Sequence, residues 1–373
     1  MQTLLFIFGT RPEAVKMAPL IKECEKYPKD FKVKIAVTGQ HREMLDQVLQ
    51  FFNIKPDYDL NLMKPNQTLF DITADALRGM EKILDEVKPD LIIVQGDTTT
   101  VFTGALAAFY KQIPIAHLEA GLRSGDKYSP FPEEMNRILT GHIADYHWAP
   151  TEKAKRNLLA EGIKEEKIFV VQNTVIDALL LALELLKKEG DSKYKEFFKD
   201  IDFNKKIVLI TAHRRESFGE PFENICNAVK ELSSKYPDVE FVYPVHLNPN
   251  VREVVYRILS NISNVHLIEP LEYPYMVWMM NKSYMVLTDS GGVQEEAPSL
   301  GKPVLVLRDV TERQEGIDAG TAKLVGTDKD LIIKEASNLL DNPKEYKKMA
   351  HAVNPYGDGN TSKRIVEILI NGK

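Results

Sequence analysis

Two acidic residues stand where strands of a parallel sheet would end, and a third follows a short distance along the chain. Asp97 follows the run "DLIIVQG", Glu119 ends the run "PIAHLEA", and Glu133 comes 14 residues after Glu119. Each alone has a structural explanation, because Asp97 can cap a helix and Glu133 follows Pro132, where first-turn acids are common. Proton transfer needs one group that gives a proton and one that accepts it, and neighbouring carboxyl groups with different pKa values supply both. The three together therefore favour an acid–base site.

Two basic residues near the N-terminus suit an anion. The stretch "FIFGTRPEAVK" places Arg11 and Lys16 at the start of a predicted helix, with Gly9 in the turn after the first strand. Helix N-termini bind anions through unpaired backbone N–H groups, and two cations would strengthen that binding. They can equally be solvated surface charges. The stretch is not G-x-G-x-x-G, so the fingerprint of nicotinamide binding is missing.

The second half of the chain has a similar arrangement of strand, polar turn and helix. "LITAHRRES" places His213 just beyond a strand, where a lone histidine is usually structural. "TDSGGVQEEAPSLGKP" runs from a strand through Ser290, Gly291 and Gly292 into a helix, and these small residues let backbone amides approach a phosphate. Glu296 can then bind ribose hydroxyls or merely complement the helix dipole.

Familiar metal-binding patterns are missing from the sequence. The eight histidines include no H-E-x-x-H motif, and two cysteines cannot supply a zinc framework. "DYD" at 57–59 follows a proline and is predicted to be a turn. We therefore expect no cofactor and no required metal ion.

The elements that must position these residues follow from the hydrophobic pattern. Short β-branched runs alternate with helical windows along the whole chain, which predicts an α/β fold with parallel sheets covered on both faces. The charged segment 187–206 has no apolar period and separates two halves, each long enough for a domain. We expect domains at 1–172 and 173–359, the second including 187–206. The last helix, within 360–373, is assigned to the first domain, although its own pattern does not show where it packs.

Composition excludes several classes of partner. The 373 residues carry 48 basic and 54 acidic side chains, a net charge of −6, so no general field attracts nucleic acid. Cys24 and Cys226 are far apart in apolar surroundings and fit reduced thiols of a cytoplasmic protein. The longest apolar run, "ALLLALELL", contains Glu184 and falls short of the roughly 20 residues that cross a bilayer. We expect a cytoplasmic protein with no membrane segment.

Ten motifs, in order and across nearly the whole chain, resemble the non-hydrolysing UDP-N-acetylglucosamine 2-epimerases. They are "FGTRPEAVKMAPL", "GQHREML", "QGDTTT", "HLEAGLRS", "SPFPEEMNR", "NTVIDALL", "AHRRES", "PVHLNPNV", "TDSGGVQEEAPSLGKP" and "NPYGDG". The resemblance implies two Rossmann-like domains of the glycosyltransferase-B type around a cleft, and a homodimer. It implies an isomerase that converts UDP-N-acetylglucosamine to UDP-N-acetylmannosamine for polysaccharide biosynthesis.

The resemblance also implies roles for individual residues. The catalytic positions match Asp97, Glu119, Glu133 and His213. The substrate-binding positions match Arg11, Lys16, Met276, Ser290, Gly291, Gly292, Glu296 and Arg313. Bacterial members bind a second substrate molecule as activator, and the matching positions are Gln40, Arg214 and His246. Met276 replaces an aromatic residue near the uracil, which leaves uracil binding to backbone contacts.

The implied reaction has to overcome a weakly acidic proton, because carbon 2 of the sugar is not beside a carbonyl. Departure of UDP gives oxocarbenium character at carbon 1 and acidifies that proton, and the missing nicotinamide fingerprint favours this route over oxidation at carbon 3. The resemblance implies elimination to 2-acetamidoglucal and re-addition, with the carboxylates handling the proton and His213 assisting the leaving phosphate. Three alternatives stay open: a hydrolysing relative that releases N-acetylmannosamine and UDP, a glycosyltransferase of the same fold, and a catalytically silent nucleotide-sugar sensor.

Overall fold

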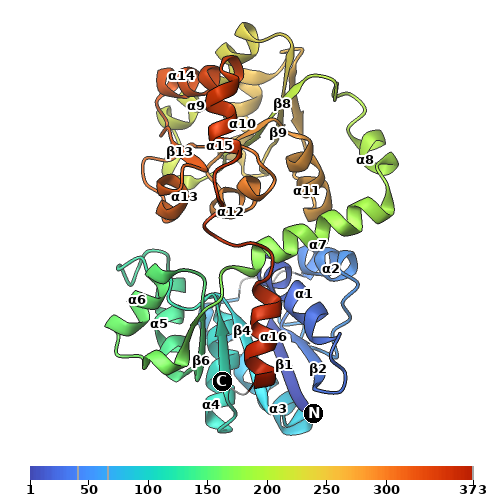
Figure 1. Ribbon diagram of the computed structural model, residues 1–373, viewed down its shortest axis with the longest axis vertical. Coiled ribbons are helices and arrows are strands. Elements are labelled where there is room, and N and C mark those ends of the chain that lie inside the picture. The colour runs from blue at the N-terminus through green and yellow to red at the C-terminus, as the bar shows by residue number, and fades with distance from the viewer. Residues whose placement is uncertain (40–41, 65–66, 372–373) are drawn as a thin grey trace. The chain divides into compact units, whose positions relative to one another are not determined.

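The computed structural model describes residues 1–39, 42–64 and 67–371, which fold into two compact units. Unit 1 comprises Met1–Leu180 and Gly357–Lys373, and unit 2 comprises Leu181–Tyr356. Each unit is a parallel sheet with interleaved helices, as the alternation of apolar runs and helical windows predicts (Figure 1). The predicted α/β class is confirmed.

Unit 1 has a seven-stranded sheet in the order β3-β2-β1-β4-β5-β6-β7, all parallel. Its strands are β1 (Gln2–Phe8), β2 (Phe31–Val37), β3 (Tyr58–Asp59), β4 (Leu91–Gln95), β5 (Ile115–Leu118), β6 (Tyr146–Ala149) and β7 (Ile168–Val170). Its helices are α1 (Arg11–Cys24), α2 (Arg42–Phe51), α3 (Leu69–Val87), α4 (Thr99–Tyr110), α5 (Glu133–Ile143), α6 (Glu152–Ala160), the short η1 (Glu165–Lys167) and α16 (Thr361–Asn371), and α7 (Thr174–Glu189) leads out of it. The strand order reverses between β1 and β4, where ligands of such sheets bind.

Unit 2 has a six-stranded parallel sheet in the order β10-β9-β8-β11-β12-β13. Its strands are β8 (Lys206–Thr211), β9 (Val239–Pro244), β10 (Val265–Ile268), β11 (Met285–Thr288), β12 (Val304–Val306) and β13 (Ala322–Leu324). Its helices are α8 (Ser192–Phe197), η2 (Arg215–Ser217), α9 (Glu220–Lys235), α10 (Pro249–Leu259), α11 (Tyr273–Lys282), α12 (Gly291–Ser299), α13 (Gln314–Asp318), α14 (Lys329–Asp341) and α15 (Pro343–Ala350). Counted from its first strand, this is the 3-2-1-4-5-6 Rossmann order, with the reversal between β8 and β11.

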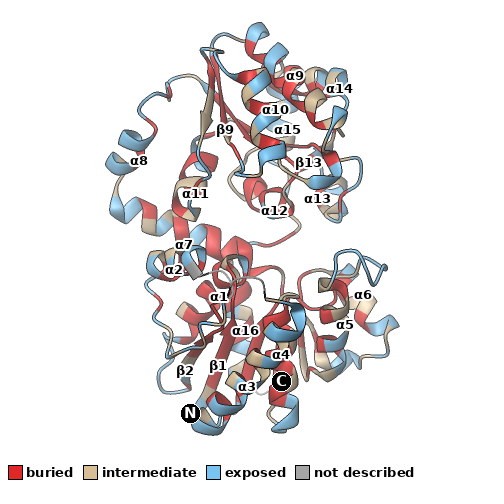
Figure 2. Ribbon diagram, turned by 180° about the vertical axis from the view of Figure 1, so that it is seen from behind, coloured by how far each residue is buried: buried red, intermediate tan, exposed pale blue. Residues whose placement is uncertain are grey.

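The core of each unit is its sheet. All five residues from Leu4 to Phe8 in β1 are completely buried, because helices cover both faces and leave no solvent side for polar alternation (Figure 2). Cys24 and Cys226 lie in the two cores, and burial raises the pKa of each thiol to about 12. Both thiols are therefore packing groups.

The chain passes between the units twice. The first passage is helix α7, which continues without a break across Leu180 and Leu181, where unit 1 ends. The boundary predicted from the sequence lies at 172/173. The helix contains no glycine or proline that would mark the boundary in the sequence. The chain returns to unit 1 between Tyr356 and Gly357, whereas the second boundary predicted from the sequence lies at 359/360. Within the described residues, α7 included, no helix is both long and apolar enough to cross a membrane.

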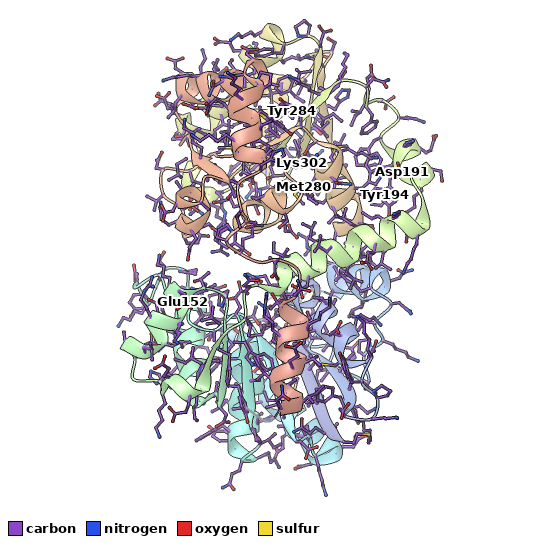
Figure 3. The ribbon with its side chains drawn as sticks, in the orientation of Figure 1. Glu152, Asp191, Tyr194, Met280, Tyr284 and Lys302 are labelled. Carbon is purple, nitrogen blue, oxygen red and sulfur yellow. The ribbon has the colours of Figure 1, made fainter. Side chains whose placement is uncertain are left out.

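The charged segment after α7 holds more structure than its sequence indicates. Tyr194 is fully buried in α8 and stacks on Trp278 of α11, with ring centroids 5.6 Å apart. Asp191, close to Tyr194 in Figure 3, accepts a hydrogen bond from the Trp278 indole at 2.9 Å. Aromatic contacts thus hold this segment against α11 of unit 2. The sequence shows no apolar period here because α8 has only six residues, too few for a helical pattern to repeat.

Candidate active site

Several predicted site residues follow the strands at which each sheet reverses its order. In unit 1, the turn after β1 begins at Gly9, and Asp97 follows the neighbouring strand β4. In unit 2, His213 follows β8 and Ser290 follows the neighbouring strand β11. Each unit therefore presents its candidate residues at the ligand-binding edge of a Rossmann-type sheet.

Glu119 of unit 1 is held by three other side chains. Both of its oxygens accept from Lys16 Nζ, at 2.7 and 2.6 Å, and the exposed fractions of the two side chains are only 7% and 17%. Gln95, the last residue of β4, also donates to Glu119, and Asn173 donates to it at 3.4 Å. Glu119 has a positive φ of 65°, a conformation that non-glycine residues rarely adopt. Such backbone strain typically persists at functional sites.

Asp97 is held by helix α5. Arg137 donates to Asp97 Oδ2 from Nε and Nη2 at 2.9 and 2.7 Å, and Asn136 donates to the Asp97 carbonyl at 2.9 Å. Glu133 begins the same helix four residues before Arg137, so both lie on one helix face. Its neighbour Glu134 is buried and accepts from Arg137 and from two backbone amides. Glu133 thus lies one helical turn before the arginine that holds Asp97, while Glu134 stabilises the local fold.

The turn after β1 depends on Glu13. Its Oε2 accepts from the amides of Gly9 and Thr10 at 2.9 and 2.7 Å, and its Oε1 accepts from the Thr98 hydroxyl at 2.5 Å. Burial raises the pKa of Glu13. A side chain at position 9 would collide with Thr38, because a β-carbon there would lie 2.0 Å from its hydroxyl. This turn places Arg11 in the first turn of α1.

His213 is anchored through its backbone. Asp289 Oδ2 accepts from the amides of His213 and Arg214 at 2.5 and 2.7 Å, and Oδ1 lies 3.6 Å from His213 Nδ1. The rings of His213 and His246 stack at a centroid distance of 5.0 Å and an angle of 6°. The structure therefore brings together His213, Arg214 and His246, three residues that the sequence spreads over 34 positions. Gln40, the remaining predicted activator residue, lies outside the described residues.

The N-terminus of α12 carries the residues that the sequence analysis assigns to phosphate binding. The first intrahelical bond runs from Gln294 N to Ser290 O, so the Gly291 and Gly292 amides precede it in the helix. A β-carbon on Gly291 would lie 3.6 Å from Arg313 Cζ, which places the guanidinium beside these amides, whereas one on Gly292 would meet nothing within 4 Å. Backbone N–H groups, the helix dipole and a guanidinium are an arrangement that binds anions. Glu312 Oε1 also lies at this helix end, 3.3 Å from the same β-carbon position.

The remaining predicted contacts lie on α11 and α12. Glu295 forms an ion pair with Arg313 and so fixes the guanidinium. Glu296, only 8% exposed, accepts from the Tyr273 hydroxyl at 3.4 Å. Burial raises the pKa of Tyr273 well above its usual value near 10, and the Glu296 carboxylate adds to that effect. Met276 lies half-buried one turn further along α11.

Comparison with known proteins gives the family of this chain. A family model described as UDP-N-acetylglucosamine 2-epimerase matches residues 22–370. The chain belongs to that family. The UDP-N-acetylglucosamine 2-epimerase of Escherichia coli (strain K12) is 55% identical to it in an alignment of length 376 that covers 99% of either chain. The UDP-N-acetylglucosamine 2-epimerase of Bacillus subtilis (strain 168) is 55% identical over 98% of this chain and 94% of its own.

A solved epimerase structure confirms the fold. The crystal structure of UDP-GlcNAc 2-epimerase from Neisseria meningitidis, bound to UDP-GlcNAc, is 54% identical and superposes with a TM-score of 0.91, covering 99% of this chain and 100% of that one. The fold is therefore the glycosyltransferase-B type of the UDP-N-acetylglucosamine 2-epimerases, which are isomerases. The predicted family and enzyme class are confirmed.

Several supporting residues of this epimerase-family chain were not identified as site residues by sequence reasoning. They are Glu13, Gln95, Arg137, Asn173 and Asp289. Signals existed for two of them: Glu13 is three residues after Thr10, as in a capping box, and Asp289 directly follows a strand. Across the described residues, no group of three or more His, Cys, Asp or Glu is arranged to hold a metal ion.

Proposed function

We propose that the chain reversibly epimerises carbon 2 of UDP-N-acetylglucosamine to give UDP-N-acetylmannosamine. The observation that carries the proposal is the carboxylate arrangement of unit 1, in which Asp97 and Glu119 end neighbouring strands and each is held by a cation. Sequence identity of 55% over 99% of the chain to a UDP-N-acetylglucosamine 2-epimerase supports the substrate.

The first half-reaction is an elimination. The bond between carbon 1 and the diphosphate oxygen breaks, and its electron pair leaves with UDP. A carboxylate takes the proton from carbon 2, and the electrons of that C–H bond form the double bond of 2-acetamidoglucal. In the second half, UDP adds back to carbon 1 while a proton reaches carbon 2 from the opposite face. No water is consumed, and the products differ from the substrate only in the configuration at carbon 2.

The two ends of the substrate need different groups. Asp97, Glu119 and Glu133 of unit 1 are assigned to proton transfer, with Arg11 and Lys16 binding the substrate's negative charge. In unit 2, His213 assists the leaving phosphate. The other unit 2 contacts are assigned to the diphosphate (Ser290, Gly291, Gly292 and Arg313), the ribose (Glu296) and the uracil (Met276). No step requires a nicotinamide or a metal ion.

The proposal extends to regulation and assembly. A second molecule of UDP-N-acetylglucosamine acts as activator through Gln40, Arg214 and His246, and the chain works as a homodimer in the cytoplasm. The stacked His213 and His246 rings support the first part, because they connect an activator residue directly to a catalytic one.

The test is incubation with UDP-N-acetylglucosamine in heavy water, without added metal or nicotinamide, followed by proton NMR. We expect deuterium at carbon 2 as UDP-N-acetylmannosamine accumulates. Free N-acetylmannosamine with UDP would show a hydrolase instead, and an unchanged spectrum would exclude the proposed activity.

A matched pair of variants tests the acid–base assignment. Glu133 has no side-chain partner among the described residues, so Glu133→Gln is expected to fold normally and to slow exchange by about 10²–10⁴-fold. Glu152, exposed on α6 and marked in Figure 3, is the control, and Glu152→Gln is expected to leave the rate unchanged. Equal rates for the two variants would remove Glu133 from the mechanism.

A further inference from the structure

We propose that Asp289 is a positioning residue for His213, holding its backbone and its imidazole so that Nε2 is the ring nitrogen presented to the leaving phosphate. The inference rests on the proposed function, which gives His213 its role at the leaving group.

The first part of the arrangement is the grip on the backbone. Thr288 of β11 pairs with Thr211 of β8, so Asp289 lies directly beside the start of the loop that carries His213. The Asp289 amide donates to the Thr211 carbonyl at 3.0 Å, and its Oδ2 accepts from His213 N and Arg214 N. One carboxylate oxygen is thus fully used in fixing the loop.

The second oxygen has a different environment. Asp289 is only 1% exposed, yet its Oδ1 has no hydrogen-bond partner among the described residues. His213 Nδ1 lies 3.6 Å from this oxygen, a distance too long for a hydrogen bond. A buried carboxylate oxygen without a donor is unfavourable, and a small rotation of the partly exposed His213 ring would supply one. Catalytic hydrogen bonds often shorten in this way once substrate binds.

The stack with His246 restrains the plane of the His213 ring, which Asp289 alone does not restrain. Parallel rings 5.0 Å apart restrain the plane of the His213 imidazole, and Asp289 then decides the direction of the ring within that plane. His246 is itself held, because its Nδ1 accepts from the Asn248 amide at 3.1 Å. With Nδ1 directed at Asp289, Nε2 is the nitrogen on the far side of the ring.

This orientation suits a group that assists a leaving phosphate. A carboxylate that accepts from Nδ1–H fixes the tautomer of the neutral ring and stabilises the imidazolium, whose Nε2–H can donate to a diphosphate oxygen. Without the carboxylate, either nitrogen can carry the proton of the neutral ring, and nothing in this arrangement selects which nitrogen faces position 289.

Asp289→Asn separates the two functions of the side chain. Its amide oxygen still accepts from both backbone amides, so the loop is retained, but its NH₂ group now faces Nδ1 and cannot accept a proton from it. We expect kcat for epimerisation to fall by about 100-fold or more, with KM changed by less than about threefold. Asp238→Asn, the same chemical change at an exposed position, is the control and should keep wild-type kinetics.

A double-mutant cycle asks whether Asp289 acts through His213. In a His213→Ala background, adding Asp289→Asn is expected to cause no further loss of kcat, since the group being positioned is gone. Wild-type kcat in Asp289→Asn, or an equal additional loss in the His213→Ala background, would overturn the proposal.

A direct measurement on the wild-type protein does not depend on turnover. In ¹⁵N NMR of the histidine rings with UDP bound, with the His213 signals assigned by comparison with His213→Ala, we expect the proton on Nδ1 at neutral pH. A proton on Nε2 alone would overturn the proposal, whatever the variants do. Absence of epimerisation in heavy water together with an Nδ1 proton would contradict the proposed function and leave the positioning geometry intact.

Discussion

At the scale of residues, both sheets use a buried carboxylate to shape the turn at the reversal of strand order. Glu13 accepts from two successive amides after β1, and Asp289 accepts from two successive amides after β8. Charge-assisted hydrogen bonds of this kind are stronger than neutral ones. The turns that carry Arg11 and His213 are therefore fixed by acids that do not themselves need to meet the substrate.

The Lys16–Glu119 pair gives a residue-scale prediction. Both side chains are largely buried, so Lys16→Met leaves the Glu119 carboxylate without its cation and should lower the free energy of unfolding by about 3–5 kcal/mol. Adding Glu119→Gln should restore most of the loss. Urea unfolding followed by circular dichroism measures both. A loss below about 1 kcal/mol in Lys16→Met would mean that water screens the pair.

A substitution at Gly292 tests phosphate binding without disturbing the fold. A β-carbon there meets nothing within 4 Å, so Gly292→Ala should leave the melting temperature unchanged or slightly higher. If the diphosphate lies against this amide, the added methyl group should weaken UDP binding by about tenfold or more, measured by calorimetry. Unchanged affinity would place the phosphate elsewhere on α12.

At the scale of elements, β5 and β6 bring two histidines together inside the sheet of unit 1. His117 pairs in register with His147, and both are buried. Burial lowers the pKa of His117 to about 4 and that of His147 to about 3. Neither ring nitrogen of His147 has a hydrogen-bond partner among the described residues. The core therefore holds neutral imidazoles that the unfolded chain would protonate.

The buried pair of His117 and His147 predicts that the folded protein loses stability as the pH falls. Below pH 6.5 the unfolded chain binds protons at these histidines and the folded chain does not, so stability falls with pH until about pH 4 for His117 and about pH 3 for His147. His147→Leu should reduce the loss between pH 6.5 and 4.5 by about 2–3 kcal/mol. Unfolding free energies at several pH values measure this.

The control for that prediction is the exposed His142. His142→Leu should leave the pH profile as in the wild type. A His147→Leu profile that runs parallel to the wild-type one would show that His147 does not carry the proton uptake.

At the scale of the whole molecule, the last helix belongs to the first unit. Helix α16 packs against α1, and its first turn is capped from α7, where Asp177 accepts from the amides of Ser362 and Thr361 at 2.7 and 3.3 Å (Figure 1). Burial raises the pKa of Asp177. Unit 1 is therefore completed only after α16 has been synthesised.

Two isoleucines of α16 test this dependence. Ile365 is completely buried and Ile370 is 46% exposed. Ile365→Ala should destabilise unit 1 by about 2–5 kcal/mol, and Ile370→Ala should change its stability by less than about 0.5 kcal/mol. Hydrogen exchange resolved by peptide measures each unit separately, and faster exchange should be confined to unit 1. Equal losses in both units would show that they unfold together.

The fold class follows from the amino-acid sequence alone, and so does the sheet edge at which several candidate site residues lie. Runs such as Leu4–Phe8 predict buried parallel strands, and residues directly after a strand must lie at its carboxyl end, so Asp97, His213 and Ser290 follow from local pattern alone. The motifs were long enough to indicate the family.

The hydrogen-bonding partners of those residues become visible only in the folded chain. Lys16 and Glu119 are 103 positions apart, and Asp289 is 76 positions from His213, so no periodicity links them. Such pairs exist because neighbouring strands in a parallel sheet come from distant parts of the chain, each after a long crossover. The same reason explains α16, whose amphipathic pattern shows that it packs but not against which unit. A local pattern determines an element and its buried face, whereas strand order determines which charges meet.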